Sequence, residues 1–175
     1  MRGSVFGTYI SHVYVYAGGN TRSAAELAMS LLFSLVREMP QAMDSLKAGK
    51  WERKKFSGTE LKGKQIGVIG TGAIGREVCR WCNVFGMKVV GYDPNITREQ
   101  AEELGIELAN SLDDLYSTSD IISVHVPGDG TKGMIGEKEM DQMKKGVLLV
   151  NAARGGVIDE QALYKKLEEG KTLVF

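Results

Sequence analysis

The sequence predicts an α/β fold in which a doubly wound parallel sheet of about six strands is preceded by a long helix. Three observations carry this prediction. Short apolar runs of the kind buried on both faces of a sheet recur along the chain. Segments with helix start and stop signals alternate with these runs, and a glycine-rich turn follows the first of them. Because the connections are short, the crossovers should be right-handed and the sheet parallel.

A long amphipathic helix is expected before the sheet. Ser23 and Glu26 have the spacing of a capping box at its start. Pro40 should kink or restart the helix, and Gly49 can end its second part. The apolar stripe can pack on the chain's own core or against a helix of a partner subunit, and it comprises Leu27, Leu31, Leu35 and Met39, flanked by Leu32 and Val36.

The segment around residues 66–75 is the most informative part of the chain. An apolar run that suits a buried strand is followed by Gly70-Thr-Gly72-Ala-Ile-Gly75, which has the G-x-G-x-x-G pattern. The first glycine permits a tight turn, the second lets a pyrophosphate approach the backbone, and the third lets the helix pack close to the strand. The pattern in this context is typical of a Rossmann dinucleotide-binding fold.

The residues after the glycine turn complete this unit. The apolar residues Ile74, Val78, Trp81 and Phe85 lie at helical spacing on one face, and Gly86 is a suitable helix end. Residues 88–92 form the second strand. Asp93 ends that strand, 18 residues after Gly75. Its carboxylate can accept hydrogen bonds from the adenosine ribose and would repel a 2′-phosphate, so NAD is favoured over NADP. The free amides at the helix start can bind phosphate.

Alternating elements continue to the end of the chain. Thr97 with Gln100 and Ser111 with Asp114 are helix starts, and Asp159 is a third. The expected elements are helix 98–104, strand 106–108, helix 112–117, strand 120–126, helix 137–143, strand 147–151, a helix from 159 to 170 and a strand from 172.

Few side chains outside the glycine turn suggest chemistry. Arg154, in the run Asn-Ala-Ala-Arg-Gly-Gly, follows a strand and offers a fixed fork of donors for a carboxylate. His125 could be a general base, but its place in a strand favours a buried, hydrogen-bonded histidine. His12 precedes any recognisable element. Cys79 and Cys82 form C-x-x-C inside a helix, where structural thiols are expected rather than a redox or metal site.

The overall composition excludes several classes of function. The chain has 22 basic and 22 acidic residues, so no net field favours nucleic acid or an anionic membrane. No apolar run approaches the roughly 18 residues of a membrane span. We therefore expect a soluble, cytoplasmic protein that binds neither nucleic acid nor membrane and has no metal site.

Five stretches resemble the D-2-hydroxyacid dehydrogenase family in order and spacing: GGNTRSAAELA, ELKGKQIGVIGTGAIGREV, FGMKVVGYDP, VHVP and VNAARGGVIDEQAL. The resemblance covers residues 17–170 and implies NAD-linked oxidation of a D-2-hydroxyacid. Two further features, SLKAGKWERKKFSGTEL and GYDP, look most like the branch that oxidises 3-phosphoglycerate to 3-phosphohydroxypyruvate in serine biosynthesis. Family members pair through this domain, which implies a homodimer or homotetramer.

The resemblance also implies roles for individual residues. Arg154 matches the catalytic arginine, which holds the substrate carboxylate and polarises its 2-oxygen. The cofactor-binding positions are Gly70, Gly72, Ala73, Ile74 and Gly75 at the pyrophosphate, Asp93 at the adenosine ribose, and Val126, Ala152 and Ala153 beside the nicotinamide.

The sequence also departs from the family pattern. Val126 replaces a usual threonine, and the loop 128–132 is about one residue short. Residues 1–19 are an uncertain lead-in or a remnant of a substrate domain, and residues 20–175 are the NAD-binding domain. The family's catalytic glutamate and histidine would lie beyond Phe175. We therefore expect this chain to bind NAD without efficient catalysis.

Two other functions remain open at this stage. Corepressors that sense NAD(H) share the fold and the NxARGG stretch, and would make the chain an interaction module. Another dehydrogenase of the family, acting on glyoxylate, hydroxypyruvate or lactate-like acids, is the other alternative.

Overall fold

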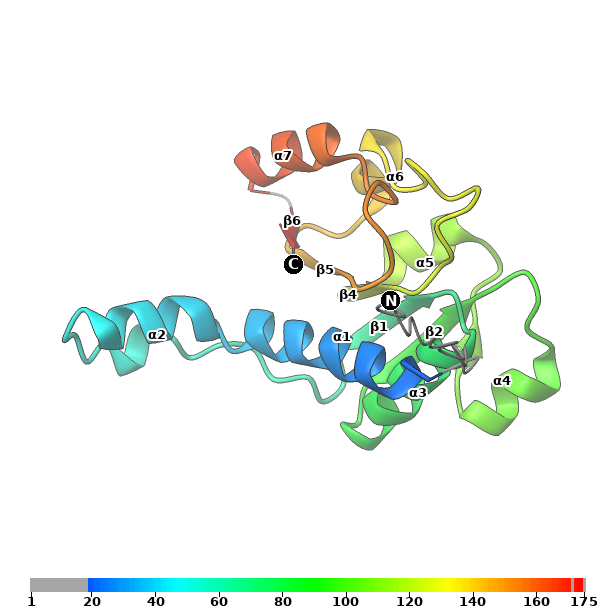
Figure 1. Cartoon of the computed structure of the whole chain (residues 1–175), viewed down its shortest axis with the longest axis horizontal. Helices are drawn as coiled ribbons and strands as arrows, with labels where there is room; N and C mark the ends of the chain where they lie inside the picture. The colour runs from blue at the N-terminus through cyan, green and yellow to red at the C-terminus, as the bar shows by residue number, and fades with distance from the viewer. Residues whose placement is uncertain (1–18, 171, 175) are drawn as a thin grey trace, which may run out of the picture.

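The computed structural model describes residues 19–170 and 172–174, in which a parallel six-stranded sheet carries helices on both faces (Figure 1). The α/β prediction is confirmed. The predictions for residues 1–18, including His12, lie outside the described residues. The elements in chain order are α1 Thr21–Val36, α2 Met39–Lys47, the 3-10 helix η1 Arg53–Lys55, β1 Gln65–Ile69, α3 Ala73–Val84, β2 Lys88–Tyr92, α4 Arg98–Leu104, β3 Glu107–Leu108, α5 Leu112–Thr118, β4 Ile121–Val124, α6 Glu137–Gln142, β5 Val147–Asn151, α7 Glu160–Glu168 and β6 Thr172–Val174.

The strand order is β3-β2-β1-β4-β5-β6, so the chain reverses its direction of winding between β1 and β4. Such a switch point is where open α/β sheets bind their ligands, beyond the carboxyl ends of the strands. The strand ends are also in register across the sheet. Ile69 of β1 pairs with Tyr92 of β2 and with Val124 of β4, and Val124 pairs with Asn151 of β5. Four neighbouring strands therefore end side by side at one edge.

Two hydrophobic cores lie on the two faces of the sheet. Ile66 and Val68 of β1 pack with α1, α3 and α4, whereas Ile69 packs with α5, α6 and α7. This alternation follows from the two-residue period of a strand. Full burial of one large aliphatic side chain contributes about 1.5–3 kcal/mol, so both faces contribute to the stability of the sheet.

Most of the helix starts and ends predicted from the sequence are confirmed. Thr97 and Gln100 form the predicted capping box, and Gly105 ends α4 at a φ of +65°. Ser111 accepts from the Asp114 amide, and Asp159 accepts from the amides of Gln161 and Ala162. Local sequence was sufficient here because each cap involves groups only two or three residues apart.

The start of α1 was predicted wrongly. The helix begins at Thr21 with Asn20 as its N-cap, and the Ser23 hydroxyl donates to the Asn20 carbonyl at 3.0 Å. Ser23 therefore lies inside the first turn and does not cap it. The restart at Pro40 is confirmed, because Glu38 has a φ of +52° and α2 begins at Met39.

The buried face of α1 also differs from the predicted stripe. Leu32 and Val36 are buried as expected, but Leu27 is 53 % exposed and Met39 of α2 is 47 % exposed. The remaining buried positions are small or flexible residues, namely Ala25, Ala28 and Met29. Small residues allow α1 to lie close to α3. A pattern based on large apolar side chains does not indicate such a face.

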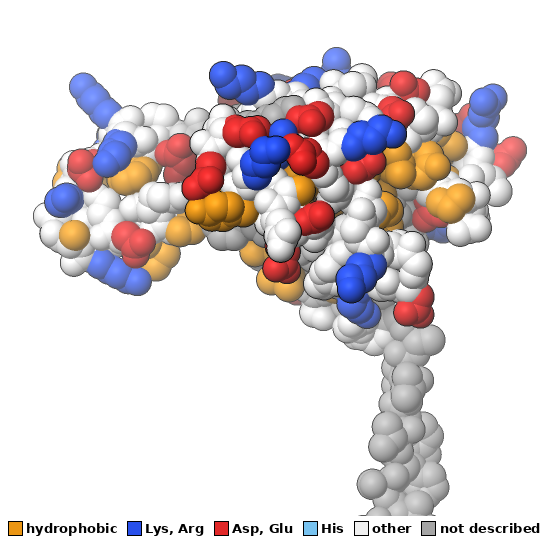
Figure 2. All heavy atoms as spheres, turned by 90° about the horizontal axis from the view of Figure 1, so that it is seen from above, with side chains coloured by type: hydrophobic (Ala, Val, Ile, Leu, Met, Phe, Trp, Pro, Cys, Tyr) orange, Lys and Arg blue, Asp and Glu red, His pale blue; other side chains and the backbone are white. Residues whose placement is uncertain are grey.

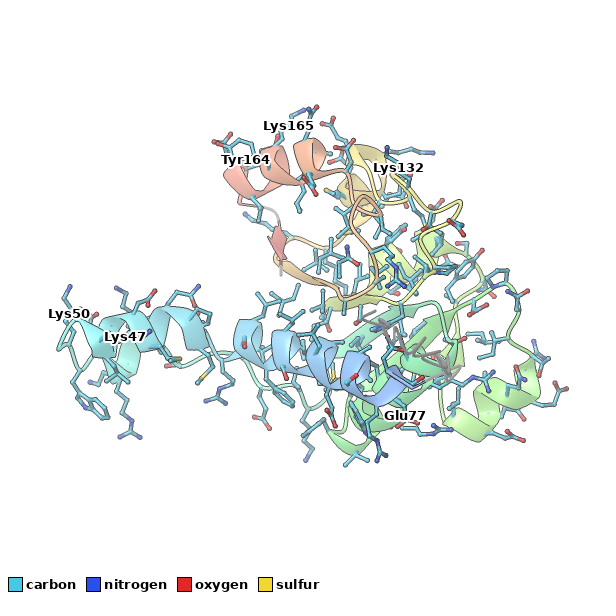
Figure 3. The ribbon with its side chains drawn as sticks, in the orientation of Figure 1. Lys47, Lys50, Glu77, Lys132, Tyr164 and Lys165 are labelled. Carbon is cyan, nitrogen blue, oxygen red and sulfur yellow. The ribbon has the colours of Figure 1, made fainter. Side chains whose placement is uncertain are left out.

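Helix α2 and the segment after it extend away from the sheet as an arm, which we define as residues 39–56 (Figure 1). Lys47 and Lys50 lie toward its far end (Figure 3). The arm exposes several large apolar side chains, and the Trp51 side chain is the most exposed at 79 %.

A cluster of charges joins α6 to α7. The Lys166 side chain is 7 % exposed, and its ammonium group lies 2.8 Å from Asp141, 3.1 Å from Glu169 and 3.7 Å from Glu137. Hydrogen bonds from Lys166 to Asp141 and Glu169 raise its pKa. On the face shown in Figure 2, basic and acidic side chains are interspersed.

Candidate functional site

Every segment proposed to bind a ligand follows one of the four aligned strand ends. Gly70 follows β1, Asp93 follows β2, Val126 lies two residues beyond β4, and Ala152 follows β5. Residues that are 84 positions apart in the sequence (Gly70 to Arg154) therefore meet along one edge of the sheet. The prediction of strand 120–126 was too long, since β4 ends at Val124.

The three glycines of the turn occupy three different environments. Gly70 has a φ of +88°, and a Cβ there would lie 2.6 Å from the His125 carbonyl oxygen. A Cβ on Gly75 would lie 2.0 Å from the Gly70 carbonyl oxygen, closer than any real contact. A Cβ on Gly72 would meet nothing within 4 Å. Two glycines are thus required by the fold, whereas Gly72 leaves its side of the turn open.

Helix α3 begins directly behind this open side. Gly72 is the N-cap residue, and Ala73 and Ile74 form the first turn. The first amides of a helix have no partner within the helix, and the helix dipole gives them a partial positive charge. Ala73 is exposed and Ile74 is half-buried, so the start of the helix is accessible to an anion.

Asp93 is half-buried beside the turn, and both of its carboxylate oxygens accept backbone hydrogen bonds. Oδ2 accepts from the Thr71 amide at 2.8 Å, and Oδ1 accepts from the Asn95 amide at 2.9 Å. The bond to Thr71 was not predicted, because it joins residues 22 positions apart.

The loop after β5 holds Arg154 through an asparagine that sequence reasoning missed. Asn151 Oδ1 accepts from the Ala153 amide, and Asn151 Nδ2 donates to the Arg154 carbonyl, each at 3.0 Å. An asparagine bonding to the backbone two residues later is a common turn, so this signal could have been read from the sequence. Val126, Ala152 and Ala153 are half-buried around this loop.

The Arg154 side chain is exposed and lies along the loop that follows β4. Its Nη1 donates to the Ala153 carbonyl at 2.9 Å. A Cβ on Gly128 would come within 3.3 Å of the Arg154 Cγ, a tight contact that the arginine could relieve only by a small shift.

The prediction for His125 was partly wrong, because the residue lies one position beyond β4 and, within the described part of the chain, only one of its ring nitrogens has a hydrogen-bond partner. Its Nε2 is 2.8 Å from the Ser123 hydroxyl, but Nδ1 is buried and has no hydrogen-bond partner within residues 19–170. Burial lowers the pKa of His125 from 6.5 to about 4. The imidazole is therefore neutral at physiological pH.

The two cysteines are structural, as expected. Cys79 and Cys82 are free and buried on the face of α3 that packs against α1, and the Cys82 thiol lies 3.9 Å from the Met29 sulfur. Burial raises the pKa of each thiol to about 12, so the reactive thiolate is rare. The predicted apolar face of this helix was partly wrong, because Phe85 is 43 % exposed and the cysteines take the buried positions.

Among the described residues, no group of three or more His, Cys, Asp or Glu side chains is placed to hold a metal ion. None of the helices in that part of the chain is long and apolar enough to cross a membrane.

The strand order, the glycine turn and the acid after β2 define a dinucleotide-binding domain of the Rossmann class. The sequence model named "D-isomer specific 2-hydroxyacid dehydrogenase, NAD binding domain" matches residues 29–174. The chain belongs to this family, and its cofactor is NAD.

Known relatives agree with this assignment. The chain is 50 % identical to a D-3-phosphoglycerate dehydrogenase of Archaeoglobus fulgidus over 88 % of its own length and 29 % of that protein. It is 45 % identical to a hydroxypyruvate reductase of Thermotoga maritima, over 88 % of its own length and 49 % of the relative. A solved D-lactate dehydrogenase of Aquifex aeolicus, complexed with NAD and lactic acid, superimposes with a TM-score of 0.81 at 39 % identity, covering 87 % of this chain and 46 % of that one. The chain thus spans less than half the length of each of these proteins.

Proposed function

We propose that this chain is the NAD-binding part of a dehydrogenase that oxidises 3-phosphoglycerate to 3-phosphohydroxypyruvate, the entry into serine biosynthesis. The observation that carries the proposal is the register of the four strand ends, which brings the glycine turn, Asp93 and the Arg154 loop to one edge. The high identity to D-3-phosphoglycerate dehydrogenase supports this choice of substrate. We also propose a cytoplasmic location, because both cysteines of this chain are free and the cytoplasm is reducing.

The proposed roles follow the order of the strands. The amides at the start of α3 hold the pyrophosphate, and Asp93 accepts hydrogen bonds from the adenosine ribose. Val126, Ala152 and Ala153 flank the nicotinamide, and NAD when bound accepts the hydride. Arg154 binds the substrate carboxylate with its planar fork, which fixes the carbon that loses the hydride. We assign no proton acceptor among the described residues, and we expect this chain alone to turn over little or no substrate.

A second substrate class is favoured by one specific finding. The Thermotoga maritima relative is named a hydroxypyruvate reductase, and it is 45 % identical to this chain. Hydroxypyruvate lacks the phosphate of the first substrate but shares its carboxylate and 2-oxygen. Arg154 would serve either acid in the same way, so the choice depends on residues that contact the far end of the substrate.

The first prediction concerns the cofactor. NADH titrated into this chain and followed by nicotinamide fluorescence should bind saturably, and NADPH should bind at least about tenfold more weakly, or roughly 1.4 kcal/mol. The reason is repulsion between Asp93 and a 2′-phosphate. Equal affinity for NADH and NADPH would contradict the proposed role of Asp93 at the adenosine ribose. Binding of neither dinucleotide would contradict the proposed function.

The second prediction concerns assembly. Large apolar side chains are exposed along α1 and the arm, and such surfaces commonly mark interfaces; they include Leu27, Met39, Met43, Leu46 and Trp51. We expect a homodimer by sedimentation, since burial of this surface would stabilise the pair. The double variant Met43→Lys/Leu46→Lys should sediment as a monomer. A wild-type chain that stays monomeric at high concentration would contradict this.

A further inference from the structure

The glycine turn is held in place by two charged side chains that bond to the backbone of Thr71. We propose that Asp93, besides binding ribose, positions the turn for the pyrophosphate, acting together with Arg76. This inference rests on the proposed dinucleotide site and adds a second task to its ribose-binding acid.

The contacts on either side of Thr71 are direct. Asp93 Oδ2 accepts from the Thr71 amide at 2.8 Å, and Arg76 Nε donates to the Thr71 carbonyl at 3.0 Å. Both bonds have one charged partner, which makes them stronger than bonds between neutral groups. Thr71 itself is 1 % exposed, so water competes little for either group.

The backbone that leads into the turn is fixed by the strands on either side of β1. The Gly70 amide donates to the Tyr92 carbonyl at 2.9 Å, and the His125 amide donates to the Ile69 carbonyl at 2.8 Å. These bonds end at Gly70. Beyond Gly70, the bond to Asp93 connects Thr71 to the end of β2, and the bond from Arg76 connects it to α3. Thr71 directly precedes the open position at Gly72.

The hydrogen bond between the Thr71 amide and Asp93 should increase the affinity of the turn for a pyrophosphate. The amides that follow Thr71 must point at the pyrophosphate before it arrives, because a turn that orders only on binding loses affinity to the cost of ordering. Removing the Asp93 carboxylate therefore has two separable effects. It removes the ribose acceptor, and it loosens the turn even for a ligand that has no ribose hydroxyls.

The test compares two ligands that differ only in those hydroxyls, ADP and 2′,3′-dideoxy-ADP, by calorimetric titration. Wild-type chain should bind ADP more tightly than dideoxy-ADP. Asp93→Ala should remove this difference and also weaken dideoxy-ADP by about fivefold to tenfold. Asp93→Asn retains one oxygen acceptor for the Thr71 amide and should weaken dideoxy-ADP by only about threefold.

Asp159→Ala is the matched control. Asp159 also accepts two backbone amides, but it caps α7, away from the turn. This variant should be less stable than wild type yet bind dideoxy-ADP normally. Wild-type affinity of Asp93→Ala for dideoxy-ADP would overturn the proposal, and Asp93→Asn provides the same comparison if the alanine variant does not fold. Failure of the wild-type chain to bind ADP or NADH would instead contradict the proposed function.

Discussion

Replacing Gly75 with alanine is expected to abolish NADH binding and to destabilise the fold by about 3 kcal/mol or more. The new Cβ would lie 2.0 Å from the Gly70 carbonyl oxygen, which is backbone and cannot rotate away. Helix α3 would have to move off the turn, and that movement would disrupt the packing of Val78 against β1. Thermal unfolding and NADH fluorescence would both report the change.

Gly72→Ala is the matched variant, and it separates binding from folding. Gly72 has a φ of −66°, and its Cβ would meet nothing within 4 Å, so stability should change by no more than about 0.5 kcal/mol. NADH binding should nevertheless weaken markedly, because the methyl group would occupy the surface that the pyrophosphate approaches. A stable Gly75→Ala protein, or a Gly72→Ala protein with wild-type affinity, would contradict these assignments.

Acidification is expected to destabilise the chain between about pH 6.5 and pH 4 because of His125. Burial lowers the pKa of this histidine to about 4 in the folded state, whereas the unfolded chain has the ordinary value of 6.5. In this window the unfolded state binds a proton that the folded state does not, so stability falls as pH falls. The total loss is about 2–3 kcal/mol. Chemical unfolding at a series of pH values would measure it.

His125→Gln is the variant that tests this cause. A glutamine cannot titrate, and its amide can still bond to the Ser123 hydroxyl, so the loss of stability between pH 6.5 and pH 4 should disappear. Below this window a second loss should remain in both proteins. This second loss comes from Asp120. Burial raises the pKa of its carboxyl, but hydrogen bonds from the Gln65 amide and from Lys144 outweigh burial and lower it. These bonds stabilise the folded state only while the carboxylate is charged, so their contribution is lost as it is protonated. An unchanged pH profile in His125→Gln would exclude the histidine as the cause.

The parts of the fold that the sequence predicted well depend on short-range geometry. The turn at Gly70–Gly75 and the caps at Thr97, Ser111 and Asp159 involve groups within five residues of one another, so their patterns are visible in the sequence. The prediction that Ser23 caps α1 was wrong, because Asn20, three residues upstream, is also a residue type that suits an N-cap. Two candidate caps this close together could not be ranked by pattern alone.

Residues whose roles depend on contacts between distant segments were not predictable. Thr71 meets Asp93 across 22 positions, and Gly128 meets Arg154 across 26 (154 − 128). The order of the strands was inferred only as parallel and doubly wound, while the pairing of β1 with β4 fixes which loops become neighbours. The candidate site was therefore predicted as a set of loops, but its internal bonds required the structure.

The pairing of β1 with β4 also has a kinetic consequence. These strands are separated by α3, β2, α4, β3 and α5, so the register that aligns Ile69 with Val124 joins residues 55 positions apart (124 − 69). Closing such a long loop costs entropy before any contact repays it, and folds dominated by distant pairings form slowly. The glycine turn and its helix can form early from local signals. The edge that unites the turn with the Arg154 loop assembles late, so binding competence should be among the last properties that a refolding chain acquires.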